Sequence, residues 1–374
     1  MIGGNHTGGQ RMCRKIFIAG TQQHSGKSTV SIALMHLARK KYDRVGYVKP
    51  IGPKVETIQG RIVDMDAVLM ARVFNLGEEF DLMSPLAFHR DFTRNFLSGK
   101  VTAAEIHRKV VQARDELEKK YDFLVIEGAG HGGVGSVIGL NNAQAAALFD
   151  APVMIITSGG IGSAIDAVQL NVALYRQEHA RMKMVLINRL LPDKREMALS
   201  CLRNAFIAHD IAVFGGFDYS PILANPTMEH VSALLKIPIT GDPEAGRRII
   251  HHIQLGAASS QKVIDDLLES TLLIVTSSRD ELIVTLSSLY HIPAFRRKIA
   301  GLIVAGHSPV TRVSQQILDD SSIPYIRFRE TTANVFSTLK EDVSKISSVD
   351  VEKISWIKDH AERHIDFAAI DALL

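Results

Sequence analysis

Cysteine is scarce in this chain, and long runs of one residue type are missing. Cys13 and Cys201 are the two cysteines among 374 residues, too few for a disulfide framework and typical of a reducing compartment. Net charge is only +3 without a long basic run, which argues against nucleic acid or an anionic membrane as partner. No apolar stretch approaches bilayer length, and the polar start lacks a signal-peptide core. We expect a cytoplasmic protein.

Apolar residues make up 46% of the sequence, enough for sizeable cores in two or three domains. After a flexible N-terminus over residues 1–14, short apolar strands alternate with helical patterns, and this alternation predicts a parallel α/β sheet over residues 15–242. The helix over Ala103–Lys120 is one example. The predicted strands are Lys15–Ala19, Arg44–Lys49, Phe123–Ile126, Val153–Thr157, Met184–Asn188 and Ile211–Phe214.

A second alternation of strands and helices begins after Pro243 and predicts a smaller α/β domain over residues 243–374. A helix over Val349–His364, which carries the single tryptophan, Trp356, ends this domain. The predicted elements before it are strands at Arg248–Gln254, Leu272–Thr276, Ile299–Ala305 and Tyr325–Phe328, and helices at Gln261–Glu269, Asp280–Tyr290 and Val313–Asp319.

The first predicted strand leads into a loop that ends in Gly-Lys-Ser and then into a helical pattern. Strand, tight loop and helix together are the setting of a phosphate-binding P-loop, whose backbone N–H groups and helix dipole favour an anion. Lys27 is placed to reach the terminal phosphates, as a candidate catalytic residue, and the Ser28 hydroxyl to bind Mg²⁺. The candidate nucleotide-binding residues are Gly20, Thr21, His24, Ser25, Gly26, Lys27, Ser28 and Thr29.

This loop has an unusual length, because five residues rather than four separate Gly20 from Gly26. A glycine- and serine-rich turn without a ligand is the alternative, which we disfavour because strand, loop and helix all agree. ATPases that dimerise through a further lysine early in the loop are also disfavoured, since Thr21-Gln22-Gln23 contains none.

Charged residues follow two other strands. Lys49 ends the second strand, where a lysine can neutralise a phosphate or a substrate carboxylate, although an ordinary solvated lysine is equally consistent. Glu127 ends the next strand and is a candidate Mg²⁺ ligand opposite Ser28. Asp66 is our choice for a further ligand, and Asp64, two residues earlier, is the alternative.

Polar residues at other strand ends are open to more than one interpretation. Asn188 ends the fifth strand, where an amide can contact an adenine edge or simply cap the strand. His131 follows Glu127-Gly-Ala-Gly and is more readily a hydrogen-bonded loop residue than a proton shuttle. The glycine loop within Thr157–Ser163 either holds a second anion or lets its helix pack closely.

Taken in order, these motifs resemble dethiobiotin synthetase. That family has a lengthened Gly-Thr-x-x-x-x-Gly-Lys-Thr loop, a Lys-Pro, an Asp-Ala, a Glu-Gly-Ala-Gly and a strand-end Asn. They match Gly20–Thr29, Lys49-Pro50, Asp66-Ala67, Glu127–Gly130 and Asn188. The resemblance implies ATP in the loop, a substrate or carbamate at catalytic Lys49, Mg²⁺ ligands, and adenine at Asn188.

A closer likeness lies with the N-terminal region of long-form phosphate acetyltransferases, carried by Ser84-Pro85, Phe92–Arg94, Glu127–Ser136 and Gly159–Asp166. The second domain resembles the DRTGG domain of the same proteins, in Leu272–Asp280 and Ala300–Pro309. Its signature is reduced to Ser277-Ser278-Arg279-Asp280 and Gly306-His307, which argues against a ligand there. The acetyltransferase catalytic domain has no counterpart here. We therefore expect a free-standing relative that is not a phosphate acetyltransferase on its own.

Two classes of function are consistent with these residues. We favour a regulatory or sensing module that binds ATP with Mg²⁺ and hydrolyses it slowly if at all. The alternative is an ATP-dependent carboxylase or ligase of the dethiobiotin synthetase type, acting on a small carboxylate or amine. A glutamine-dependent amidoligase is disfavoured because no cysteine follows Cys201. A small metabolite, a partner protein and a homo-oligomer are the other expected interactions.

Overall fold

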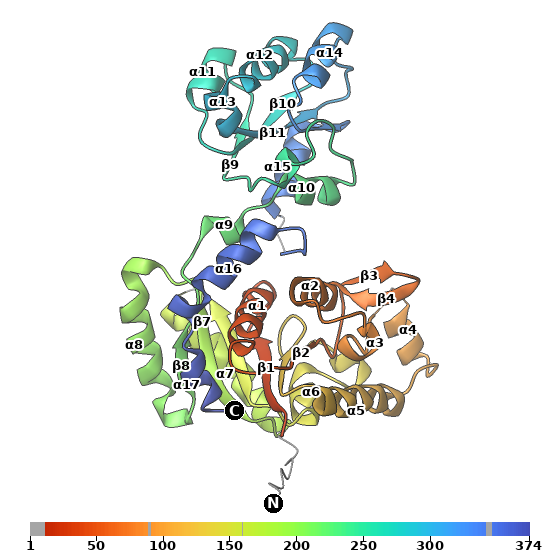
Figure 1. Cartoon of the computed structure of the whole chain (residues 1–374), viewed down its shortest axis with the longest axis vertical. Helices are drawn as coiled ribbons and strands as arrows, with labels where there is room; N and C mark the ends of the chain where they lie inside the picture. The colour runs from red at the N-terminus through yellow and green to blue at the C-terminus, as the bar shows by residue number, and fades with distance from the viewer. Residues whose placement is uncertain (1–11, 89–90, 159, 342–345) are drawn as a thin grey trace, which may run out of the picture. The chain divides into compact units, whose positions relative to one another are not determined.

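The computed structural model describes residues 12–88, 91–158, 160–341 and 346–374, and Figure 1 shows its elements. The chain forms two compact units: residues up to Tyr219 together with Ile346–Leu374, and Ser220–Lys345. These boundaries differ from the predicted division at residue 242 in two ways: the second unit already begins at Ser220, and the C-terminal helix belongs to the first unit. Of the predicted flexible N-terminus, residues 1–11 lie outside the described part, whereas Arg14 already begins the first strand.

A six-stranded sheet forms the centre of the first unit, in the order β2-β5-β1-β6-β7-β8, with every pair parallel. The central strands are buried almost throughout, as expected for a parallel sheet covered on both faces. All six strands predicted for this region are present. Their bounds are β1 Arg14–Gly20, β2 Val45–Val48, β5 Phe123–Glu127, β6 Val153–Ser158, β7 Met182–Asn188 and β8 Ala212–Gly215.

Helices connect these strands. The longest, α5 (Ala103–Lys120), matches its predicted bounds, because a capping box of Thr102 and Glu105 fixes its start and four apolar side chains at helical spacing face the core. The other helices before β8 are α1 Lys27–Ala38, α2 Met65–Phe74, α3 Phe80–Met83, α4 Phe92–Leu97, α6 Asn142–Leu148, α7 Ile161–Gln177 and α8 Arg195–Phe206, with short 3₁₀ turns at Ser136–Ile138, Pro192–Lys194 and Ile207–His209.

A small antiparallel hairpin lies between β2 and α2 and was not predicted. Its strands are β3 (Val55–Ile58) and β4 (Arg61–Asp64), joined through Gln59 and Gly60, both of which have positive φ. The second strand ends at Asp64, which caps α2. The hairpin therefore sets where α2 begins and which of its first residues face the interior.

The second unit contains a four-stranded parallel sheet in the order β12-β11-β10-β9. Buried apolar side chains form two separate clusters, one containing Leu273 and Val275, the other Leu272 and Ile274, so both faces of this sheet carry a core. Its elements are α9 Pro221–Ala224, α10 Met228–Leu235, a 3₁₀ turn at Ala245–Arg247, β9 His252–Leu255, α11 Ser260–Asp265, β10 Thr271–Thr276, α12 Asp280–Tyr290, α13 Pro293–Lys298, β11 Ile299–Ala305, α14 Arg312–Asp320, β12 Tyr325–Phe328 and α15 Thr332–Glu341.

The C-terminal segment returns to the first unit as α16 (Val351–His364) and α17 (Phe367–Asp371). Helix α16 packs along α1, as Figure 1 shows. Asp371 is held by a hydrogen bond from the Tyr42 hydroxyl, at 2.7 Å, and by an ion pair with Lys41. Within the described residues no helix is long and apolar enough to cross a membrane.

Candidate nucleotide-binding site

The predicted phosphate-binding loop joins β1 to α1 at the carboxyl edge of the sheet. Two of its residues, His24 and Gly26, have positive φ, of 59° and 97°, which bends the backbone sharply before α1 begins. A side chain at Gly20 would fill the loop, since an added Cβ would lie 2.6 Å from the Ser25 hydroxyl and 2.8 Å from Lys27 Nζ. A side chain at Gly20 would displace the Ser25 and Lys27 side chains, and the positive φ of Gly26 favours glycine there.

Polar groups gather around this loop. The Lys27 ammonium donates to the carbonyl oxygens of Gly130, at 2.6 Å, and Gln22, at 3.3 Å. Both acceptors are neutral, so a phosphate oxygen would be the stronger acceptor for this cation. The Ser25 hydroxyl is fully buried and has no hydrogen-bond partner among the described residues. An unpartnered buried hydroxyl beside Lys27 fits a site for an anion.

Other loop residues make local contacts. The Thr21 hydroxyl lies 3.2 Å from that of Thr157, which ties the loop to β6. Thr29 lies half-buried in the first turn of α1. Gly159, in the second predicted glycine loop, lies outside the described residues.

A buried cluster of charges lies beside the loop. The Lys49 ammonium donates to Asp66 at 2.7 Å and to Glu127 at 2.9 Å, and its side chain is 3% exposed. The Ser28 hydroxyl lies 3.2 Å from Asp66 Oδ1 and 3.1 Å from Glu127 Oε1. The structure thus brings together three residues proposed as Mg²⁺ ligands, with Lys49 between the two carboxylates.

The charge state of Lys49 follows from these neighbours. Burial lowers the pKa of an ammonium, but the negative charges of Asp66 and Glu127 outweigh that effect and raise the pKa of Lys49 above its usual value. Lys49 is therefore protonated at neutral pH. The hydroxyl of Tyr47 donates to the other Glu127 oxygen, and burial together with that carboxylate raises the pKa of Tyr47 well above its usual range.

The two aspartates at the start of α2 have different roles. Asp64 is the N-cap, and its carboxylate accepts a hydrogen bond from the Asp66 backbone N–H at 2.9 Å. The Asp66 carboxylate instead faces Ser28 and Lys49. Asp64 turns back toward its own helix as a cap, so Asp66 rather than Asp64 faces the loop, and its role as a metal ligand stays a prediction.

Asn188 lies under the loop. Its amide donates to the Ser25 carbonyl at 3.3 Å and accepts from the Phe217 backbone N–H at 3.1 Å, and the residue is 3% exposed. An added Cβ at Gly26 would come within 2.1 Å of its Nδ2 atom. The structure thus gives Asn188 a supporting role under the loop, in line with the capping role that was the alternative, and the contact to adenine stays a prediction.

Three functional residues were missed. Tyr47 could have been found, because it precedes Lys49 by two positions on a strand and so shares its face. Asn142 holds the glycine segment after β5, donating to the carbonyls of Ala129 and His131, both at 2.6 Å. Neither Asn142 nor Phe217 carries a sequence signal that separates it from an ordinary buried residue.

The oxygen donors fit Mg²⁺, which binds hard oxygens and usually combines one or two carboxylates with phosphate and water. Among the described residues no three His, Cys, Asp or Glu side chains are grouped so as to hold a metal by themselves. A cation here would therefore depend on the Ser28 hydroxyl and on nucleotide phosphates in addition to Asp66 and Glu127. Such a cation would supply positive charge beside the terminal phosphates.

The strand order, the Gly-Lys-Ser loop and the acidic residue at the end of β5 define a P-loop NTPase fold. Residues 14–240 match the model of the AAA domain family AAA_26, which covers more than half of the chain. The chain belongs to this family.

Curated relatives agree with that assignment. Phosphate acetyltransferase of Nitratidesulfovibrio vulgaris is 25% identical over 97% of this chain and 52% of its own length. ATP-dependent dethiobiotin synthetase BioD of Methanocaldococcus jannaschii is 36% identical over 31% of this chain and 52% of its own length. The chain thus spans about half the length of these two relatives.

Among solved structures, the MinD cell division protein of Aquifex aeolicus covers 56% of this chain and 84% of its own, at 14% identity and a TM-score of 0.36. So low a score supports no statement about this chain.

Proposed function

We propose that this protein is a regulatory or sensing module that binds ATP with Mg²⁺ in its first unit and hydrolyses it slowly if at all. The position of Lys49 carries this proposal. In a ligase of the dethiobiotin synthetase type, this lysine would hold a substrate carboxylate or carbamate. Here it is 3% exposed and bonded to two carboxylates, so its charge is directed at the candidate metal ligands rather than at a substrate.

We propose that the second unit is DRTGG-like and carries no catalytic activity. Arg279 donates to the carbonyls of Gly256 and Ala258, at 2.9 and 2.8 Å, and so fastens the loop after β9. Asp280 accepts from the Thr311 hydroxyl at 3.1 Å. These reduced signature residues serve loop structure, and we propose that the unit responds to events in the first unit or to a partner protein.

The alternative, an ATP-dependent carboxylase or ligase, is tested by turnover. ATP hydrolysis by the intact protein is measured with Mg²⁺ and a panel of small carboxylates and amines. A sensing module shows slow turnover that no compound increases strongly. A large increase with one acid or amine would establish the ligase and reject the sensing role.

The metal ligands are tested by a matched pair of variants. Asp66→Asn removes a carboxylate that faces Ser28, whereas Asp64→Asn alters the carboxylate that caps α2. We expect Mg²⁺ to strengthen ATP binding in wild type and in Asp64→Asn, and to lose most of this effect in Asp66→Asn. Equal dependence on Mg²⁺ in all three proteins would remove Asp66 from the ligand set.

A further inference from the structure

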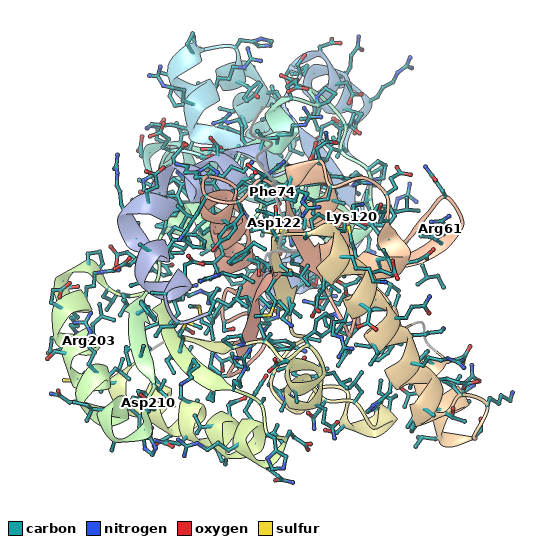
Figure 2. The ribbon with its side chains drawn as sticks, turned by 60° about the horizontal axis from the view of Figure 1, so that its bottom comes forward. Arg61, Phe74, Lys120, Asp122, Arg203 and Asp210 are labelled. Carbon is teal, nitrogen blue, oxygen red and sulfur yellow. The ribbon has the colours of Figure 1, made fainter. Side chains whose placement is uncertain are left out.

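Helix α16 contacts three elements around the candidate nucleotide-binding site. It packs along α1, the helix that follows the phosphate-binding loop. It reaches α2, which begins beside Asp66, through Lys358, whose ammonium lies 5.0 Å from the centroid of the Phe74 ring. Phe74 is labelled in Figure 2 and is the last residue of α2. The third contact is with the segment after β8.

This third contact is an aromatic cluster, which we call the Phe217 cluster. Phe217 is 1% exposed, and its ring centroid lies 5.7 Å from that of Trp356 and 5.7 Å from that of His364. Trp356 in turn stacks on His360 at 4.1 Å. The three α16 residues recur every four positions and so form one stripe along the helix. The cluster comprises Phe217, Trp356, His360 and His364.

A short series of hydrogen bonds joins the Phe217 cluster to the phosphate-binding loop. The Ser25 carbonyl accepts from Asn188, and the same amide accepts from the Phe217 backbone N–H, at 3.3 and 3.1 Å. Gly26 packs directly against Asn188, because a Cβ added at Gly26 would lie only 2.1 Å from Asn188 Nδ2. Because this region is tightly packed, a movement of the loop around a phosphate must displace Asn188 or be resisted by it.

Both connections between the two units are close in sequence to residues of the Phe217 cluster. It leaves the first unit after Tyr219, two residues beyond Phe217, and it re-enters at Ile346, shortly before α16 begins at Val351. Both connections to the second unit therefore start from segments that contact each other in the Phe217 cluster.

We propose that α16 couples the nucleotide-binding loop to the two segments that connect the units. Nucleotide binding moves Asn188 and Phe217, and α16 moves with them. This inference rests on the proposed nucleotide binding and adds a route for its signal. Coupling of this kind is reciprocal. If ATP binding changes the position of α16, then a ligand or partner that moves α16 must change the affinity for ATP by the same factor.

Trp356 provides the test, because it is the single tryptophan of the chain. The intact protein is titrated with ATP and Mg²⁺ while tryptophan emission is recorded, and binding is measured in parallel by calorimetry. We expect the emission to change and to saturate with the dissociation constant found by calorimetry. Binding heat without an emission change would overturn the coupling and leave nucleotide binding intact. If neither signal appears, both proposals fail.

Two variants test the route. Phe217→Leu keeps the backbone N–H that donates to Asn188 but removes the ring beside Trp356. We expect this variant to lower the emission change by about twofold or more. Phe214→Leu is the control, because Phe214 makes no ring contact with Trp356 among the described residues, and it should keep the full change. If Phe217→Leu melts without cooperativity, His364→Ala removes the other ring against Phe217 at a half-buried position. A full emission change in a folded variant of either kind would overturn the route.

Discussion

Replacing Lys49 by methionine removes the ammonium that donates to both Asp66 and Glu127. The side chains of the three residues are 3%, 8% and 1% exposed, so water cannot substitute for the lost charge. Removing one partner from a buried ion pair costs about 3–5 kcal/mol, because the remaining charge stays buried. We expect the free energy of unfolding to fall by about that amount at neutral pH.

A second lysine provides a matched control. Lys15 pairs with Glu118 at 2.7 Å, the same distance as Lys49 to Asp66, but the two side chains are 16% and 30% exposed. Lys15→Met should therefore cost at most about 1 kcal/mol. Both variants are compared with wild type by urea unfolding. An equal loss for the two variants would contradict the claim that burial makes the Lys49 cluster sensitive.

The effect of pH on these proteins has a definite sign. In wild type the raised pKa of Lys49 means that its contribution is complete below the ordinary lysine pKa of about 10.4 and is lost only at higher pH. The deficit of Lys49→Met should therefore be present in full at neutral pH and disappear only above the ordinary lysine pKa. Mg²⁺ at about 100 times its dissociation constant should restore about 2.7 kcal/mol, provided that it binds only the folded state.

The remaining predictions concern the loop and the C-terminus. Gly26→Ala places a Cβ 2.1 Å from Asn188 Nδ2 on a backbone with φ of 97°. Calorimetry should therefore show no ATP binding, and the free energy of unfolding should fall by about 1–3 kcal/mol. Normal ATP affinity would contradict the observed packing. Asp371→Asn weakens the contacts with Tyr42 and Lys41 and should cost about 1–3 kcal/mol at neutral pH. Burial opposes ionisation of Asp371, but its partners hold the pKa below 3.8, so the advantage of wild type should disappear only as pH falls below that value. An advantage lost at higher pH would refute this assignment.

Local signals account for the parts of the fold that the sequence predicted well. Helices α5 and α12 have the predicted bounds, and in α5 the capping box at Thr102 marks the start directly. The boundary between the units was misplaced for a different reason. The apolar stripe of α16 shows that one face is buried, but periodicity does not say which surface covers it. Only the folded chain shows that this surface is α1 rather than the second unit.

The candidate site also contains residues that the sequence could predict and residues that it could not. Parallel strands end at one edge of a sheet, so Lys49 and Glu127 could be expected near the loop from their positions alone. The sequence favoured Asp66 over Asp64, but the hairpin that ends at Asp64, the cap of α2, could not be predicted, because it is too short to leave a clear pattern. The double hydrogen bonding of Asn188 could not be predicted either, because its partner Phe217 comes from a different loop.

Calorimetric titration of the intact protein with ATP and Mg²⁺ tests the central claim most directly. We predict binding of micromolar strength, on the order of 8 kcal/mol, since the loop offers backbone N–H groups, a buried ammonium and an unpartnered hydroxyl. In Lys27→Ala the charge directed at the terminal phosphates is absent, and affinity should fall by about tenfold or more. Equal affinity in the two proteins, or no binding by wild type, would contradict the assignment of this loop as a nucleotide-binding site.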